Sequence, residues 1–321
     1  MKILVSIARI LVGITFLFSG FVKLIDPLGS AYKFQEYFSP EVLNLEFLSP
    51  YALPFSIFLI IIEIMLGVMI LIGFKSKLTA WGLLVIMLVF LFLTWYSAYY
   101  DKVQDCGCFG DALKLSSWDT FYKNIILVAL VILLVVRSYD ITPILGYTTE
   151  KWVTLASLFT FLFITYYVLV HLPIIDFRPF AIGNSIPAGM EYTDEEDFPP
   201  IKDFFLESET EDLTPQLMKE EKLLLVIAYD LDKSDIQGFA NLKPILTKAK
   251  EKGYKIYGVS SSLKDDFDAI NKEHGLEFDV LFCDGTALKT VIRSNPGLIT
   301  ISKGIVMDKR SWTDANDLII K

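Results

Sequence analysis

Residues 52–73 read ALPFSIFLIIIEIMLGVMILIG, and Glu63 is the one charged side chain among them. A helix rises about 1.5 Å per residue, so this segment is long enough to cross the hydrocarbon core of a bilayer, which is about 30 Å thick. A carboxylate in such a position is costly, but the remaining side chains favour lipid. The segment therefore predicts a transmembrane helix.

Four further segments have the same character, which gives an all-α transmembrane domain over residues 1–172. The expected helices are 3–25, 52–73, 78–98, 121–137 and 152–172. The fourth is the weakest because its uninterrupted apolar run covers only Ile125–Val136, so the stem of Lys123 has to reach the interface. The first segment is too long for a signal peptide and no small-x-small cleavage site follows it, so we expect it to stay as a helix.

The overall composition agrees with a membrane domain joined to a different, acidic one. Of the 321 residues, 53% are hydrophobic, and the mean hydropathy is +0.49. Residues 1–172 contain equal numbers of acidic and basic side chains, so the net charge of −9 arises from residues 173–321. This charge argues against nucleic-acid binding, which needs a basic surface. Three cysteines and two histidines are too few for a disulfide-stapled fold or a dedicated metal site.

The distribution of Lys and Arg over the short loops predicts the orientation. The N-terminus and the loops after the second and fourth helices carry Lys2, Lys75, Lys77, Arg137 and Lys151. The opposite loops, 26–51 and 99–120, are longer and more acidic. By the positive-inside rule we expect a cytoplasmic N-terminus in a bacterial inner membrane. Five crossings then place the C-terminal domain, and the loop 99–120, on the periplasmic side.

The second half of the chain predicts a linker followed by an α/β domain. Residues 173–220 are acidic and rich in Pro, Gly, Ser and Thr, so we expect a linker with little structure of its own. Residues 221–321 alternate between strand and helix patterns and end in a hairpin signal and a closing helix over the last eight residues. The expected strands are Lys222–Tyr229, Tyr254–Ser260, Asp279–Cys283, Leu298–Ser302 and Ile305–Asp308. This order predicts helices packed on a mixed sheet.

The most informative short motif is Cys106-Gly107-Cys108, in the loop between the third and fourth helices. A disulfide across so small a ring needs a distorted backbone, which the glycine makes attainable. Such a bond would be readily reduced, which favours a redox pair close to a membrane face where a quinone could accept electrons. The alternatives are a permanent loop staple, two free thiols, or half of a metal site without its partners.

Two charged residues lie within the expected membrane helices. Arg9 is about two turns into the first, and Glu63 is near the centre of the second. Counted from the cytoplasmic helix ends, they differ in depth by about 6 Å, so the sequence predicts a buried ion pair between them. A proton relay through Glu63 is the alternative. His171, at the outer end of the fifth helix, is either an interfacial side chain without a role or a neighbour of the cysteine loop.

The first four helices resemble the DoxX superfamily of small membrane proteins. The resemblance rests on Arg9–Gly13, Ser19–Lys23 and Glu63–Gly67, and the segment Asp105–Asp111 is similar to the redox-associated, MauE-like branch. It covers about residues 1–137 and implies a four-helix core, to which the fifth helix is added. For MauE itself it implies a role in maturing methylamine dehydrogenase, an enzyme rich in disulfides.

Residues 221–321 resemble the thioredoxin and peroxiredoxin folds. The resemblance is carried by Asp284–Thr286, Ser294–Leu298, the hairpin that follows and Trp312. It implies that Pro296 occupies the position of the cis-proline of those folds. The loop Asp230–Asp235 lacks the Cys-x-x-Cys motif, so we expect this domain to have no thiol chemistry of its own. Cys283 ends an apolar strand and is expected to be an inert core residue.

Together these features favour a membrane-embedded thiol–disulfide protein acting through Cys106 and Cys108. Its partner would be an extracytoplasmic protein client or a small thiol, which the thioredoxin-like domain would dock. Two alternatives stay open: a non-catalytic assembly factor in which the cysteines staple a loop, and a small-solute or proton conduit.

Overall fold

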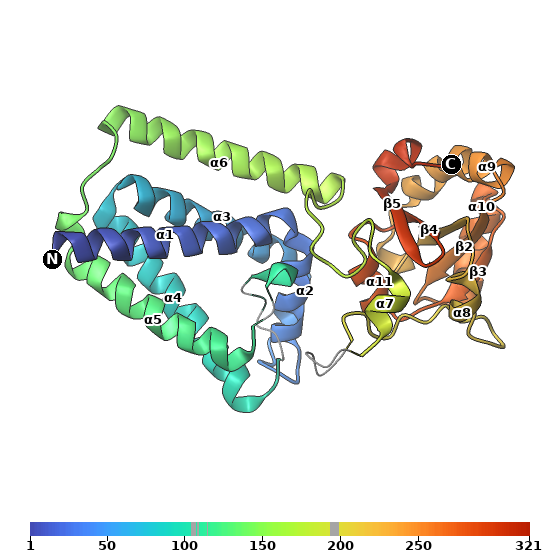
Figure 1. Ribbon diagram of the computed structural model, residues 1–321, viewed down its shortest axis with the longest axis horizontal. Helices are drawn as coiled ribbons and strands as arrows, with labels where there is room; N and C mark the ends of the chain where they lie inside the picture. Colours follow the sequence, from blue (N-terminus) through green and yellow to red (C-terminus); the bar gives the residue numbers. More distant parts are fainter. Residues whose placement is uncertain (104–106, 108, 114, 193–198) are drawn as a thin grey trace. The chain divides into compact units, whose positions relative to one another are not determined.

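The structure is a computed structural model that describes residues 1–321 except 104–106, 108, 114 and 193–198. The chain forms two compact units, Met1–Val168 and Leu169–Lys321. The first is helical and the second is built on a β-sheet (Figure 1). Cys106 and Cys108, the predicted redox pair, lie outside the described residues.

Among the residues that the structure describes, five long apolar helices confirm the predicted membrane region. They are α1 (Lys2–Ile25), α3 (Ala52–Ile72), α4 (Ser76–Tyr100), α5 (Ser117–Val136) and α6 (Tyr147–Val170). Each is long and apolar enough to cross a membrane. Helix α5 begins four residues before its predicted start, because the Ser116 hydroxyl caps it by accepting a hydrogen bond from the Asp119 amide at 3.1 Å. The protein is thus a multi-pass membrane protein.

The sequence did not predict helix α2 (Pro27–Phe38), which follows α1 after a single residue. The Asp26 carboxylate caps it by accepting from the Gly29 amide at 3.0 Å, and Pro27 occupies the first turn, where its missing N–H costs nothing. A short 3-10 helix, η1 (Glu46–Tyr51), leads into α3. Helix α2 is too short to span a bilayer, which is why a search for apolar spans leaves it in a loop.

Close packing of α1 against α3 forms the centre of the helical unit. Three glycines allow the approach: Gly13 lies against Leu71, Gly20 against Ile64 and Gly67 against Leu17. A Cβ atom at Gly20 would lie 2.8 Å from the Cβ of Ile64, so a larger residue would force the helices apart. Helix α5 packs on α4. Helix α6 keeps most of its large apolar side chains exposed, as a helix facing lipid does.

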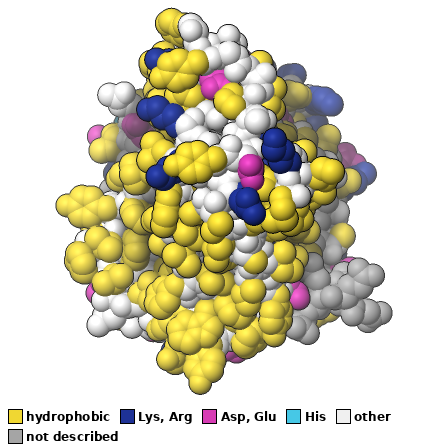
Figure 2. Space-filling model, turned by 90° about the vertical axis from the view of Figure 1, so that its left-hand side faces the viewer, with side chains coloured by type: hydrophobic (Ala, Val, Ile, Leu, Met, Phe, Trp, Pro, Cys, Tyr) yellow, Lys and Arg dark blue, Asp and Glu magenta, His cyan; other side chains and the backbone are white. Residues whose placement is uncertain are grey.

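Figure 2 shows the end of the helical unit from which α1 starts. Basic side chains gather there within a broad field of hydrophobic ones. The N-terminus of α1, the turn between α3 and α4, and the connection from α5 to α6 lie at this end (Figure 1). These are the basic segments on which the expected cytoplasmic orientation depends.

The second unit contains one five-stranded mixed sheet in the order β3-β2-β1-β4-β5. Its strands are β1 (Leu223–Ile227), β2 (Lys255–Ser260), β3 (Asp279–Phe282), β4 (Gly297–Ser302) and β5 (Ile305–Ser311). Strands β1, β2 and β3 are parallel, whereas β4 is antiparallel to both β1 and β5. All five predicted strands are therefore present, and the predicted hairpin joins the last two.

Both faces of the sheet are covered, so the central strand β1 is buried along its whole length. Helices α9 (Ile236–Glu251) and α10 (Lys264–His274) pack on one face. Helix α11 (Gly285–Val291) packs on the other. The closing helix predicted for the last eight residues is wrong: the chain forms a 3-10 helix, η5 (Trp312–Asp317), and ends without regular structure.

The prediction that residues 173–220 form a linker with little structure of its own is also wrong for the described part of that segment. It contains two short helices, α7 (Ile186–Met190) and α8 (Thr214–Leu217). Its apolar side chains enter the core beside α11: Phe180, Ile186, Ile201, Phe204, Leu206 and Leu217. Glu207 also exchanges backbone hydrogen bonds of 2.9 and 2.8 Å with Phe282 at the edge of β3. Because α11 is short, the segment 173–220 covers the rest of the sheet face on which α11 packs. The apolar residues of the segment show no regular spacing, so no pattern in the sequence indicated this role.

Candidate functional site

The described residues next to the two cysteines are held against the helical unit. Gly107 has a φ of +66°, a conformation that suits glycine, and a Cβ there would lie 3.1 Å from Cγ of Lys33 on α2. The Phe109 ring is buried, 5.5 Å from the ring of Phe18 on α1. The ammonium of Lys123 on α5 lies 4.2 Å from the centre of the same ring. Residues on both sides of Cys108 therefore contact three helices.

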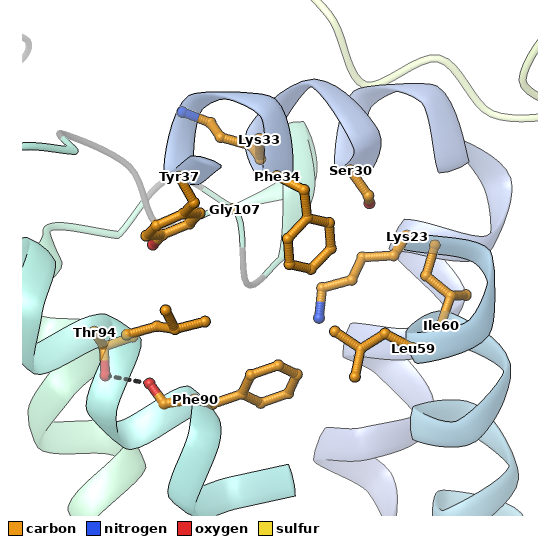
Figure 3. A pocket seen from close by; sticks show the side chains of 11 residues that line it. Lys23, Ser30, Lys33, Phe34, Tyr37, Leu59, Ile60, Phe90, Thr94 and Gly107 are labelled. Atoms are coloured by element: carbon orange, nitrogen blue, oxygen red, sulfur yellow. Dashed lines mark hydrogen bonds between the residues drawn. The ribbon is translucent and has the colours of Figure 1, made fainter. Parts of the chain in front are cut away.

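Beside Gly107 is a pocket inside the helical unit (Figure 3). It is lined by Lys23 of α1, by Ser30, Lys33, Phe34 and Tyr37 of α2, by Leu59 and Ile60 of α3, by Phe90, Leu93 and Thr94 of α4, and by Gly107. The Lys23 ammonium points into the space between the rings of Phe34 and Phe90 (Figure 3). The volume of the cavity is about 50 Å³. The helix that the sequence analysis missed, α2, thus supplies the largest share of the wall.

An ion pair between Lys23 and Glu63 lies at one side of the pocket. The Lys23 ammonium donates to Oε1 of Glu63 at 3.0 Å and to Oε2 at 2.8 Å, and also to Oγ of Ser19 at 2.9 Å. The side chains are 11% and 2% exposed. Two opposite charges that are buried together and hydrogen-bonded avoid the cost of an isolated charge in a low dielectric. The sequence did not identify Lys23 as the partner of Glu63, because Lys23 is near the end of the expected first helix, where a lysine side chain normally reaches water.

The predicted ion pair between Arg9 and Glu63 is wrong, because each residue has other partners: Glu63 pairs with Lys23, and Arg9 bonds to the backbone. Arg9 donates to three backbone carbonyls: those of Ile70 at 2.8 Å, Leu71 at 2.6 Å and Thr142 at 2.8 Å. It thereby satisfies carbonyls at the end of α3 that have no partner within that helix. The carboxylate that attracts its charge is that of Glu150, buried in the first turn of α6.

The register of the two helices explains this correction. Gly20 packs on Ile64, so Glu63 is level with the end of α1 that carries Lys23. Arg9 is eleven residues before Gly20, which is about 16 Å along the axis. The predicted pairing assumed that the first residues of α1 and the last residues of α3 lie at the same depth. In the structure, the start of α1 extends past the end of α3.

Further polar side chains are buried near the pocket. Nδ2 of Asn124 donates to Oγ1 of Thr94 at 3.2 Å, which joins α5 to α4. The hydroxyls of Tyr37 and Ser97 lie 3.1 Å apart and share a hydrogen bond between α2 and α4. Thr94 and Ser97 are polar positions within an apolar stretch, which is the one signal in the sequence that could have marked them.

In the second unit, the peptide bond before Pro296 is cis, as the resemblance implied. The loop before it is tied to the loop after β1. Nδ2 of Asn295 donates to the Asp230 carbonyl at 2.7 Å, and the hydroxyl of Ser234 donates to Oδ1 of Asn295 at 3.0 Å. These two loops meet at the carboxyl end of β1, where the sequence has no cysteine.

The thiol of Cys283 is buried at the end of β3. Burial raises the pKa of this thiol to about 12, and the nearby charge of Asp284 adds to that effect. The thiolate, which is the reactive form, is therefore scarce at neutral pH. His171, the other residue left open by the sequence, pairs with Asp314 of the same unit at 2.7 Å.

A second buried ionic cluster attaches the segment after α6 to the sheet. The ammonium of Lys309, on β5, donates to Oδ2 of Asp176 at 2.6 Å and to the carbonyls of Phe180 and Val291. Burial lowers the pKa of Lys309 to about 7. Burial alone would raise the pKa of Asp176, but Arg178 and Lys309 outweigh it and lower that pKa to about 2. The cluster was missed because Lys309 is far in the sequence from Asp176 and Arg178.

The helical unit is similar to a known family. Residues 1–137 match the family described as Methylamine utilisation protein MauE. The matched region includes α1 to α5, the pocket, the pair of Lys23 and Glu63, and both cysteines of the Cys-Gly-Cys motif. A comparison with curated proteins gives no match. The chain is thus similar to MauE over the residues that form the pocket, and α6 and the second unit lie beyond that similarity.

Proposed function

We propose that the protein exchanges disulfides at the membrane surface through Cys106 and Cys108. The observation that carries the proposal is the attachment of Gly107 and Phe109 to α1, α2 and α5, beside the pocket that contains Lys23. The described residues on either side of Cys108 are thus anchored on the membrane domain. The similarity to MauE supports a redox-linked role in the maturation of another protein.

The chemistry needs both thiols. One cysteine, as a thiolate, attacks a disulfide of a partner, or is attacked in the reverse direction, and a mixed disulfide forms. The second cysteine then resolves the mixed disulfide and releases the partner. Asp105 and Asp111 flank the motif in the sequence and would disfavour a thiolate, whereas the start of α5 would favour one if the loop folds back over it, so exchange is expected at an ordinary rate.

The second unit is proposed to bind the extracytoplasmic client, in the manner of a thioredoxin-like domain without its own thiol chemistry. The support is the pairing of the loop after β1 with the cis-proline loop, and the high pKa of Cys283. In this arrangement the N-terminus is cytoplasmic and the second unit periplasmic. Because this unit lies beyond the similarity to MauE, its client need not be methylamine dehydrogenase.

Trapping of the mixed disulfide tests the proposed function. Each single variant, Cys106→Ser or Cys108→Ser, should accumulate an adduct of higher mass that a reductant releases. The double variant should give no adduct while its helical unit still assembles, because so small a loop contributes little chain entropy to stability. Cys283→Ser is the matched control and should behave as the parent. Single variants that give no adduct would refute the proposal and leave the motif as a loop staple in a non-catalytic assembly factor.

A further inference from the structure

The segment that follows α6 carries its side chains inside out. Its apolar side chains face outward: Ile174, Ile175 and Phe177 are 59%, 43% and 42% exposed. Its charged side chains face inward, since Arg178 is buried and Asp176 is largely buried. A segment that faces water has the reverse arrangement, with apolar side chains inside and charged ones outside. The three exposed residues, Ile174, Ile175 and Phe177, are called the apolar patch below.

Hydrogen bonds from the core of the second unit hold this arrangement in place. The Asp176 carboxylate accepts from the backbone N–H of Arg178 at 3.1 Å and from its guanidinium at 2.7 and 3.0 Å. The ammonium of Lys309 donates to the same carboxylate at 2.6 Å and to the Phe180 carbonyl at 3.0 Å. If the segment turned over, these bonds would break and Lys309 would be left as a buried charge without its carboxylate. The outward position of the apolar patch is therefore stabilised by the fold.

The apolar patch follows a membrane helix closely in the chain. Helix α6 has 24 residues and ends at Val170, so it is about 36 Å long and extends past a hydrocarbon core of about 30 Å. Tyr166 and Tyr167 lie near its end, as tyrosines at a membrane interface do. Ile174 and Phe177 are four and seven residues beyond α6, so even a fully extended chain places them at most about 14 and 25 Å from its end. The patch is thus within reach of the lipid surface.

The end of α6 is also bound to the second unit, to which its last residue, Val170, belongs. The Val170 carbonyl accepts hydrogen bonds from the hydroxyls of Ser311 at 3.0 Å and Thr313 at 2.9 Å. The next residue, His171, pairs with Asp314 at 2.7 Å. Because the second unit holds the last residue of a membrane helix, no long tether separates its exposed apolar side chains from the bilayer.

We propose that the second unit rests on the lipid bilayer through the apolar patch, with Ile174, Ile175 and Phe177 inserted among the lipid head groups. Charge attraction does not drive this contact, because residues 173–321 carry the whole net charge of −9 and anionic lipid repels them. Burial of aliphatic and aromatic side chains at the interface stabilises the contact on neutral lipid as well. The contact restricts the second unit to the membrane surface and does not require disulfide exchange.

Fluorescence quenching by lipid tests the contact in the full-length chain. Cys106, Cys108 and Cys283 are replaced by Ser, and the one new cysteine of Ile175→Cys is labelled with the fluorophore NBD. The protein is placed in phosphatidylcholine nanodiscs with and without a lipid that carries a nitroxide near its head group. Insertion of the patch among the head groups predicts that the nitroxide lowers the fluorescence at least about twofold.

The matched control is a label in Ile305→Cys. Ile305 is 41% exposed, which is close to the exposure of Ile175. It begins β5, whereas Ser311, which binds the end of α6, is the last residue of that strand. Six residues of strand separate the two by about 20 Å. The nitroxide lipid should therefore leave the fluorescence of this label unchanged.

A pair of variants distinguishes insertion of the patch from mere attachment to α6. In the labelled Ile175→Cys protein, Ile174→Ser/Phe177→Ser removes the other two side chains of the patch and leaves the connection to α6 intact. Quenching should then fall to the level of the Ile305→Cys control. Phe282→Ser changes an exposed residue of β3, at the opposite edge of the sheet from β5, and should leave the quenching unchanged.

Three results would overturn the proposal. Quenching in Ile175→Cys that is no stronger than in Ile305→Cys would show that water surrounds the patch. A blue-shifted emission without quenching would show that protein covers the patch, for example a second copy of the chain or a client. Quenching that persists in Ile174→Ser/Phe177→Ser would show that attachment to α6 alone brings the label near lipid. None of these results depends on Cys106 and Cys108, so disulfide exchange can fail while the contact with lipid stands.

Discussion

Disruption of the pair between Lys23 and Glu63 should destabilise the helical unit strongly, and removal of both charges should destabilise it far less. In Lys23→Met the Glu63 carboxylate, 2% exposed, loses the two hydrogen bonds of 2.8 and 3.0 Å. Breaking one side of a buried ion pair costs about 3–5 kcal/mol, whereas replacing both partners by apolar residues of similar size is often near neutral. We expect about 3 kcal/mol for Lys23→Met and about 1 kcal/mol or less for Lys23→Met/Glu63→Leu.

The assay is reversible unfolding of the purified protein in mixed micelles with increasing SDS, followed by far-UV circular dichroism. A double-mutant cycle with Lys23→Met and Glu63→Leu should give a coupling energy of about 2 kcal/mol or more. The pair of Lys33 and Glu36, whose side chains are 34% and 41% exposed, is the matched control. Its cycle should give about 0.5 kcal/mol, as is usual for exposed pairs.

A third cycle distinguishes the observed pairing from the predicted one. Arg9→Met and Glu63→Leu should be additive within about 0.5 kcal/mol, because Arg9 bonds to the carbonyls of Ile70 and Leu71, which lie about 10–12 Å along the axis of α3 from Glu63. Strong coupling between Arg9 and Glu63, or none between Lys23 and Glu63, would refute the account of this site.

Three other outcomes are expected. The stability of the second unit should fall by roughly 2 kcal/mol as the pH is lowered from about 4 to 2, because the pKa of Asp176 is lowered from 3.8 to about 2 and the unfolded chain takes up the proton first. The variant Asp176→Asn should lack this part of the pH dependence, and an unchanged slope in that variant would contradict the prediction. Cys283, whose thiol is buried, should resist maleimide at pH 8 and react once the protein is unfolded; rapid labelling of the native protein would contradict this. Protease added to intact spheroplasts should remove the second unit, and protection until lysis would reverse the proposed orientation.

Much of the fold could be predicted because single segments carry its signal. Apolar runs of about 20 residues mark the five long helices wherever they occur, and β1 is a continuous apolar run because it is buried on both faces. Helix α2 and the segment 173–220 carry no such signal. The segment 173–220 contributes apolar side chains at irregular spacing. In α2, Ala31, Phe34 and Phe38 recur at helical spacing, but the run is too short to be found as an apolar span.

The site could be predicted less well because it depends on register. The sequence identified Glu63 as a buried charge that needs a partner, and it identified the Cys-Gly-Cys motif as a feature of the outer loop. It could not choose between Arg9 and Lys23 as that partner, because the choice depends on where Gly20 meets Ile64. The pocket requires α2 to lie across three other helices, and no local pattern encodes that arrangement.

The redox state of Cys106 and Cys108 in living cells is the most direct test of disulfide exchange. Cells are quenched with acid, free thiols are alkylated with a reagent that shifts the mass, and the Cys283→Ser variant is compared with and without respiration. The account predicts a mixture of dithiol and disulfide that moves towards the dithiol when respiration stops. A disulfide that stays fully closed under both conditions would contradict it.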